Sequence, residues 1–534
     1  MTVTEAPPSA PTETRPAAVR ELRGLPAVLG SGDHKTVGRL WLGGAALFLL
    51  GTVVVGAILG FEAVTLDKLE VLGRDNVLQA FSAYRWGLAF LVVIPFFLGL
   101  ATAIVPLQVG APSIAFPRAA AGALWTWFGG AIVLVLSYAL DGGPVGGPDI
   151  DADAVAMGLV GLALVLIGIV LGTVCVVTTA IALRAPVMRL FHVPPFTWSM
   201  VVAGSIWILS IPVLLAGVLL AYLDLRYGQV EFATPDTLFQ RLQWAFDQPQ
   251  VYVLAIPVLG IAAEVVPVSV GVVQKGRAAV LAGIAAFGAL AFGAWAQPAF
   301  DPSILEDAPY VLVAFVIGLP LLAVVGGLAD SARTGTPKLR PPLLLAVLGI
   351  LVLLAAVGAG AAHVVDGLDL LGTSWQPAHL DLVFTACLLG VAAGVAWWAP
   401  KLWGRFVPTP VALLAGLVIA GGGLLTAVPK GIAGALDQPA FPFAGGFEIE
   451  DSMETLNLVS AIGAIVLALG AVLLVLGLLR AALGRGRHDD VDDPWAGQTL
   501  EWSTTSPPPV GNFAAPVPEV TTATPLVATD EEGA

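Results

Sequence analysis

The polar side chains best placed for chemistry stand together in an otherwise apolar segment, WAFDQPQVYVLAIPVLG, residues 244–260. Asp247, Gln248, Gln250 and Tyr252 are residue types that a helix buried in lipid seldom uses for packing. Gln248 and Tyr252 are four positions apart, so on a helix they face the same side. An amide and a phenol at this spacing can exchange hydrogen bonds. The pattern alone leaves open whether they form a working site.

The other chemically capable residues are few. Both cysteines, Cys175 and Cys387, lie inside apolar runs, which excludes a disulfide framework and a thiolate metal site. Asp247, Asp381 and Arg85 fall near the ends of apolar runs. We expect the two carboxylates to form a polar vestibule or to pair with Arg85, because an arginine within a membrane is costly without a partner.

The composition is that of a protein surrounded by lipid. Of the 534 residues, 57% are hydrophobic and 12% are charged, whereas a soluble protein carries about 25% charged residues. The apolar runs reach the roughly 20 residues that cross a bilayer. The sequence therefore predicts an all-α, polytopic membrane protein with the lipid bilayer as its solvent. Twelve transmembrane helices are expected, at residues 40–61, 80–105, 119–140, 154–183, 196–223, 246–272, 278–297, 309–330, 341–363, 378–400, 408–428 and 454–481.

The charges predict which side of the membrane each end occupies. Most of the 24 Lys and Arg residues fall on the side shared by the even-numbered loops and both termini, so by the positive-inside rule both termini are cytoplasmic. Acidic residues gather on the opposite face, where they could attract a basic soluble protein or could simply reflect the exclusion of cations. The chain has no basic nucleic-acid patch, and no nucleic-acid partner is expected.

The polar ends of the chain predict two tails around one membrane domain. Residues 1–36 are polar and proline-rich, typical of a disordered cytoplasmic tail. Residues 37–484 form the membrane domain. Residues 485–534 are expected to be a second cytoplasmic tail, mostly disordered, with its Trp residues laid along the cytoplasmic face.

Four stretches carry a family resemblance: DHKTVGRLWL (33–42), PLQVGAPSIAFPR (106–118), RAPVMRLFHVPPFTWSMVV (184–202) and DPWAGQTLEWSTTSPPP (493–509). They resemble stretches of subunit I of cytochrome c oxidase, a member of the haem-copper oxidase superfamily, and they occur in the same order and at the same spacing as in that family. Twelve spans with both ends inside the cell is also that family's architecture. The resemblance implies this bundle in the plasma membrane of a bacterium, beside other respiratory oxidase subunits.

The resemblance also implies a ligand set that this chain mostly lacks. The family holds haem iron and copper with six histidines, and this chain has five in all: His34, His192, His363, His379 and His488. Only His379 matches a ligand position, that of the high-spin haem. The other ligand positions match residues that are not histidine: Tyr84, Gln248, Gln297, Pro298 and Asp381. The resemblance thus implies one candidate haem ligand, His379, and no copper site.

Other positions of the family's machinery are changed as well. Its proton-pathway acid and lysine match Ser113 and Val324, and the arginine pair at the haem propionates matches Lys430 and Gly431. Gln248 keeps the volume of a histidine but is a poor ligand for copper. We therefore interpret the segment around Tyr252 as a filled-in site in which the tyrosine is packed and hydrogen-bonded.

Three functions remain open from the sequence. The first is a subunit I homologue that has lost its redox centres and contributes structure or regulation to a respiratory complex. The second is a true oxidase subunit, reducing oxygen and pumping protons, or a one-haem electron relay through His379. The third is a transporter or haem-handling protein that uses the emptied cavity.

Overall fold

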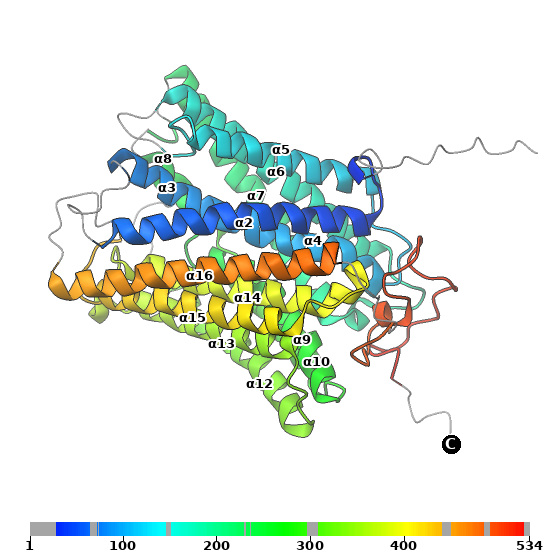
Figure 1. Ribbon diagram of the computed structural model, residues 1–534. Coiled ribbons are helices and arrows are strands. Elements are labelled where there is room, and N and C mark those ends of the chain that lie inside the picture. The colour runs from blue at the N-terminus through cyan, green and yellow to red at the C-terminus, as the bar shows by residue number, and fades with distance from the viewer. Residues whose placement is uncertain are drawn as a thin grey trace, which may run out of the picture.

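The computed structural model describes residues 28–64, 72, 74–145, 151–228, 231–234, 237–295, 308–440, 450–484 and 492–527. Eleven helical stretches in this part of the chain are long and apolar enough to cross a membrane. The seventh expected span, at residues 278–297, corresponds to the shorter α10 (Arg277–Ala291). Each of the twelve predicted spans therefore has a helix, and the all-α polytopic bundle is confirmed (Figure 1).

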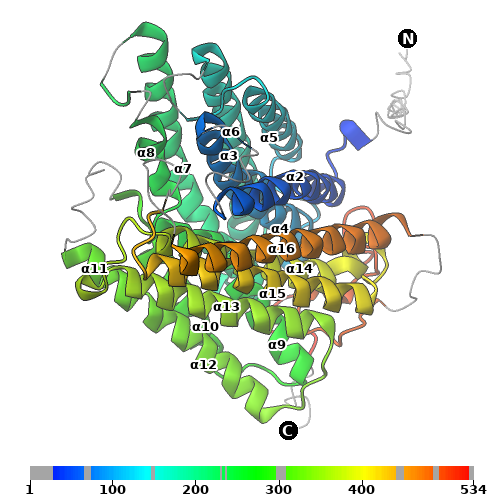
Figure 2. The same cartoon turned by 60° about the vertical axis from the view of Figure 1, so that its left-hand side comes forward.

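The helices follow one another through the bundle in chain order. The long helices are α2 (His34–Glu62), α3 (Arg74–Trp86), α4 (Ile94–Gln108), α5 (Pro117–Tyr138), α6 (Ala152–Ala182), α7 (Pro195–Tyr227), α9 (Ile256–Val270), α12 (Gly318–Thr334), α13 (Pro341–His363), α14 (Trp375–Trp403), α15 (Thr409–Gly434) and α16 (Asp451–Leu483). The short ones are α8 (Leu238–Leu242) and α11 (Ala308–Val316). In the turned view of Figure 2, α5–α7 lie on one side of α2 and α16, and α10–α12 lie on the other side.

Two spans change helix type just before a proline. The second span passes through a π-helical turn, Gly87–Val93, ahead of Pro95. The sixth begins as a 3₁₀ helix, Gln250–Ala255, ahead of Pro257. Proline lacks the N–H that continues the α-helical ladder. A local change of helix type re-satisfies the freed carbonyls inside a membrane.

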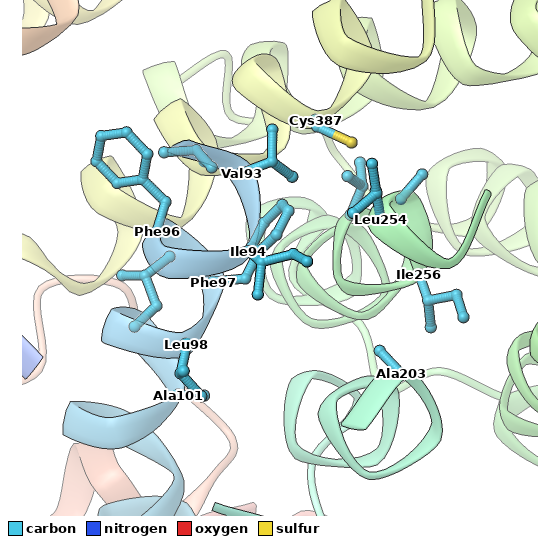
Figure 3. Close-up of a cluster of buried hydrophobic side chains, with 14 of the residues drawn as sticks. Val93, Ile94, Phe96, Phe97, Leu98, Ala101, Ala203, Leu254, Ile256 and Cys387 are labelled. Carbon is cyan, nitrogen blue, oxygen red and sulfur yellow. The ribbon is translucent and has the colours of Figure 1, made fainter. Parts of the chain in front are cut away.

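Three spans each contain a stretch of 18 residues that is entirely buried inside the bundle: Asn76–Gln108, Gln250–Val270 and Trp375–Trp403. Their middle sections meet in an apolar core, in which Phe97 of α4, Leu254, and Cys387 of α14 lie close together (Figure 3). These are also the spans that carry or adjoin the candidate site residues. The bundle therefore presents those residues to its interior and not to lipid.

The segment 492–527 packs against one end of the bundle, called here the tail end. Trp495 stacks on Trp397 with ring centroids 5.1 Å apart, and Trp502 meets the same ring edge-on at 5.6 Å. Asn512 accepts from Lys35 at 3.0 Å and contacts His34 Nε2 at 2.9 Å. These contacts join the segment to the first and tenth spans.

A buried pair of carboxyl groups also holds the segment in place. Gln108 Nε2 donates to Glu264 Oε1 at 2.6 Å and to Glu501 Oε1 at 3.0 Å. Trp398 Nε1 lies 3.4 Å from Glu501 Oε1. Among the described residues Glu501 Oε2 has no hydrogen-bond partner. One amide thus bridges a carboxyl of the sixth span and a carboxyl of the tail.

Candidate functional site

The candidate residues gather in two polar clusters near the end of the bundle opposite the tail. The first, called here the tyrosine–histidine cluster, consists of Gln248, Tyr252 and His379. The Tyr252 hydroxyl lies 2.8 Å from His379 Nε2 and 3.3 Å from Gln248 Oε1. The Gln248 amide donates to the carbonyl oxygen of Gly360, in α13, at 3.1 Å. All three side chains are buried.

The contact between Gln248 and Tyr252 arises from a different local structure than the sequence predicts. The expected helix over 246–272 would place them one turn apart. Gln248 instead stands in a turn, and the 3₁₀ helix that carries Tyr252 begins at Gln250. Their side chains still meet, so the prediction that they face the same side is confirmed, although they do not share a helix.

Gly360 allows this cluster to close. A Cβ at this position would collide with the Tyr252 hydroxyl and Gln248 Oε1, and would lie 3.1 Å from His379 Nε2. The neighbouring amide, Gln250, is satisfied elsewhere: it donates to Ser210 Oγ at 3.1 Å and accepts from the Gly293 N–H at 2.9 Å. The two glutamines therefore complete hydrogen bonds within the protein.

The second cluster, called here the tyrosine–aspartate cluster, consists of Tyr84, Asp381 and Lys430. The Tyr84 hydroxyl donates to Asp381 Oδ1 at 3.3 Å, and Lys430 Nζ donates to Asp381 Oδ2 at 2.5 Å. Asp381 is 5% exposed, so its charge depends on these donors for stabilisation. The Tyr84 ring packs against Gly56 of α2, where a side chain would collide with it.

Arg85 and Asp247 lie beside these clusters. The sequence predicts that Arg85 pairs with a carboxylate, but this ion pair is not found among the described residues. Among the described residues Asp381 forms its ion pair with Lys430 and not with Arg85. The Arg85 guanidinium lies over the Phe81 ring, 4.1 Å from its centroid. Asp247 accepts from Gln376 at 2.7 Å. Burial raises the pKa of Asp247 to about 6, although the charge of Arg85 and the Gln376 amide act to lower it.

A cavity of about 90 Å³ adjoins the tyrosine–aspartate cluster. Its walls come from α2, α3, α14, α15 and α16 and include Arg85, Asp381 and Lys430. Sites for drug-sized ligands and cofactors usually measure about 300–1,000 Å³. The cavity therefore fits a small molecule and not a porphyrin.

Other predicted residues lie apart from the clusters or outside the described chain. Gln297, Pro298 and His488 are outside the described residues. His34 lies at the tail end with Asn512. His363 ends α13 with its Nε2 buried and unpartnered within the described chain.

A sequence model of the cytochrome c and quinol oxidase polypeptide I family matches residues 36–466. The chain belongs to this family. It is 29% identical over 504 residues to a putative cytochrome c oxidase subunit 1-beta of Streptomyces avermitilis, covering 90% of this chain and 88% of that protein. It is 28% identical over 510 residues to cytochrome c oxidase subunit 1 of Bacillus subtilis, covering 90% and 79%.

The fold agrees with this assignment. The structure of a heme-copper terminal oxidase dimer, solved by cryo-electron microscopy, matches with a TM-score of 0.68 at 15% sequence identity, over 85% of each chain. The bundle is thus that of an oxidase polypeptide I. The family resemblance implies haem and copper, and each of these groups needs ligand side chains that are free to bind it.

The residues present do not fit a haem held between two axial ligands in the tyrosine–aspartate cluster. Metal–ligand bonds from protein side chains are about 2 Å long, so two axial ligands stand about 4 Å apart with the porphyrin between them. Tyr84 and Asp381 are in direct contact at 3.3 Å. Two positions that the resemblance matches to metal ligands thus bind each other.

The tyrosine–histidine cluster fits a haem no better. His379 Nε2, the atom that would bind iron, lies 2.8 Å from the Tyr252 hydroxyl, and the two rings meet edge to face with centroids 5.4 Å apart. A porphyrin on His379 would have to displace Tyr252. No group of three or more His, Cys, Asp or Glu side chains in the described chain is arranged to hold a metal ion.

Sequence reasoning missed two parts of these clusters. Gly360 was not singled out, because a glycine inside a span gives no sign of which side chain needs its space. Lys430 was matched to a haem-propionate position, but its partner Asp381 is 49 residues away and only the fold joins them. The sequence does hold one sign of this pair, because a lone cation, Lys430, and a lone carboxylate, Asp381, lie in or next to neighbouring spans.

Proposed function

We propose that this chain is a non-catalytic member of the oxidase polypeptide I family, which keeps the bundle and contributes structure or regulation to a respiratory membrane complex. The supporting observation is the pair of direct contacts at the ligand positions, Tyr84 with Asp381 and Tyr252 with His379. A haem at either position would have to separate side chains that satisfy each other.

The copper position supports the same proposal. Gln248 uses both its amide nitrogen and its amide oxygen within the protein. An amide is also a much weaker ligand for copper than imidazole. In this proposal the chain binds neither haem nor copper, and its partners are other oxidase subunits.

The proposed setting is the plasma membrane of a bacterium, with many spans and both termini in the cytoplasm. This orientation follows from the excess of Lys and Arg at the tail end of the bundle. The acidic residues then lie outside, where a basic soluble partner would be attracted at short range.

The test is a haem and metal assay on the purified, detergent-solubilised protein, with an oxidase complex prepared in parallel. We expect no band in the reduced-minus-oxidised spectrum, no pyridine haemochrome and no copper by mass spectrometry. One haem per chain would contradict the proposal, provided that His379→Ala removes it and His34→Ala does not. That result would support an electron relay through His379.

A second measurement tests the partner. Mild solubilisation and affinity capture should recover other oxidase subunits with this chain in fixed ratio. Recovery of this chain without such subunits, in detergents that keep the parallel oxidase complex intact, would contradict a role within a complex.

A further inference from the structure

The cavity beside Asp381 is lined by several polar side chains, each with a known number of hydrogen-bond donors and acceptors. Its volume of about 90 Å³ compares with about 10–15 Å³ for one water in the same measure. There is room for several water-sized groups. Which kind of molecule suits it depends on whether the wall has donors or acceptors to spare.

The negative group in the wall is already satisfied. Asp381 accepts from Tyr84 on one oxygen and from Lys430 on the other. A cation in the cavity would compete with Lys430 for this carboxylate and would be repelled by Lys430 and Arg85. The cavity is therefore poorly suited to a cation.

Most N–H and O–H donors of the neutral polar side chains in the wall already form hydrogen bonds within the protein. Ser374 donates to the Lys430 carbonyl, Thr426 to the Gly422 carbonyl and Ser460 to the Thr426 carbonyl, each at 2.8 Å. The amides of Gln438 and Asn457 donate to each other, at 3.2 and 2.9 Å. These groups shape the cavity but do not set its charge preference.

Two cations supply the spare donors. The Arg85 guanidinium has five N–H groups and is 3% exposed. The charges of Asp247 and Asp381 attract it, but within the described chain its N–H groups form no hydrogen bond or ion pair. The Lys430 ammonium has three N–H groups, and its bond to Asp381 uses one. A buried cation without hydrogen-bond partners is costly, so an acceptor in the cavity would be stabilising.

We propose that this cavity binds a small oxyanion, a carboxylate or phosphate group, held by Arg85 and Lys430. Arginine binds such groups through paired N–H···O bonds, and lysine adds a point charge. The inference rests on the proposed function, because a haem in this part of the bundle would occupy the cavity. The anion comes either from solution or from the headgroup of an anionic lipid.

The test uses the full chain in nanodiscs of phosphatidylcholine, titrated with sodium acetate and with inorganic phosphate against chloride at constant ionic strength. Binding is measured as a concentration-dependent rise in the melting temperature. In parallel, native mass spectrometry of protein extracted from membranes containing phosphatidylglycerol measures retained anionic lipid.

Three variants make the test specific. Arg85→Gln removes the unpaired cation, and we expect the dissociation constant to rise about tenfold or more, as for loss of a charged hydrogen bond. Ala464→Phe places a ring in the cavity from α16 and leaves both cations, so it should also abolish binding. Arg226→Gln is the matched control, because Arg226 pairs with Asp153 and does not line the cavity.

The outcomes separate the two possible sources and the two proposals. A melting shift with acetate or phosphate that both cavity variants lose supports an anion from solution. Retained phosphatidylglycerol that both variants lose supports a lipid headgroup. If haem-free protein shows neither, or if the control loses the effect equally, the anion site is wrong while the proposed function stands. A haem band in the absorption spectrum of the same sample would overturn both.

Discussion

Replacing Glu501 by Gln should stabilise this protein, although it removes a charged side chain that is hydrogen-bonded in the core. Glu501 Oε1 and Glu264 Oε1 both bind Gln108 Nε2, at 3.0 and 2.6 Å. The two oxygens are therefore at most about 5–6 Å apart. At an effective dielectric constant of about 20, two ionised carboxylates at that distance would repel each other by about 3 kcal/mol, so the pair must either carry that repulsion or hold a proton at a similar cost.

The Gln side chain keeps what Glu501 contributes. Its amide oxygen can still accept from Gln108 and Trp398. Its amide nitrogen replaces Oε2, which has no partner in the described chain. The loss is the attraction of Lys401, whose charge Glu501 favours. We expect a net gain of about 1–2 kcal/mol in the free energy of unfolding, since Lys401 offsets part of the repulsion.

The assay is a comparison of unfolding in mixed micelles for the wild type, Glu501→Gln, Glu264→Gln and the double variant. Either single substitution removes the same repulsion, so the second should add nothing and the cycle should show a coupling of about 1–2 kcal/mol. Glu501→Ala is the contrasting variant and should lose about 2–4 kcal/mol, because it leaves Gln108 and Trp398 unpaired beside a cavity. A destabilised Glu501→Gln, or additive effects in the cycle, would refute the reasoning.

Three further predictions concern the two clusters and the residue between them. In a double-mutant cycle of Asp381→Asn and Lys430→Gln, each single variant should lose about 2–3 kcal/mol in the free energy of unfolding, because breaking one side of a buried pair leaves a lone charge. The double variant should lose less than the sum of the two. Additive losses in a melting assay would show that the pair is absent. Gly360→Ala should lose about 2–3 kcal/mol in the free energy of unfolding by overpacking against Tyr252 and Gln248. Gly358→Ala is the control and should be neutral or stabilising, because the space at its Cβ is open. Equal melting temperatures for the two variants would contradict the packing. The raised pKa of Asp247 means that the folded state holds its proton more tightly than the unfolded state, so stability should fall as the pH rises from about 4 to about 6. Asp247→Asn should remove that slope, and an unchanged pH profile would exclude Asp247 as its source.

The sequence was sufficient for the fold because membrane spans are encoded locally. Each span is a run of apolar residues, and lipid leaves helices as the only way for such a run to satisfy its backbone. The seventh span is shorter than its apolar run because α10 ends at Ala291, before the Gly293 N–H bonds to Gln250. That bond joins positions 43 residues apart and has no local signal.

The clusters were predictable in their members and not in their pairing. Gln248 and Tyr252 are expected from the sequence to face the same side, because only four positions separate them. Asp381 was expected to meet Arg85 or form a vestibule, and it pairs with Lys430, because which of two cations lies closer is decided by helix packing. The role of His379 as a haem ligand remains a prediction that a spectrum can test.

The first transmembrane helix is held by a residue that is synthesised long after it. His34 and Lys35 contact Asn512, 478 and 477 positions later. A ribosome must therefore add more than 470 residues after His34 before the start of the first span acquires these partners. A nascent chain that ends before Asn512 keeps these polar groups at the head of that span without them.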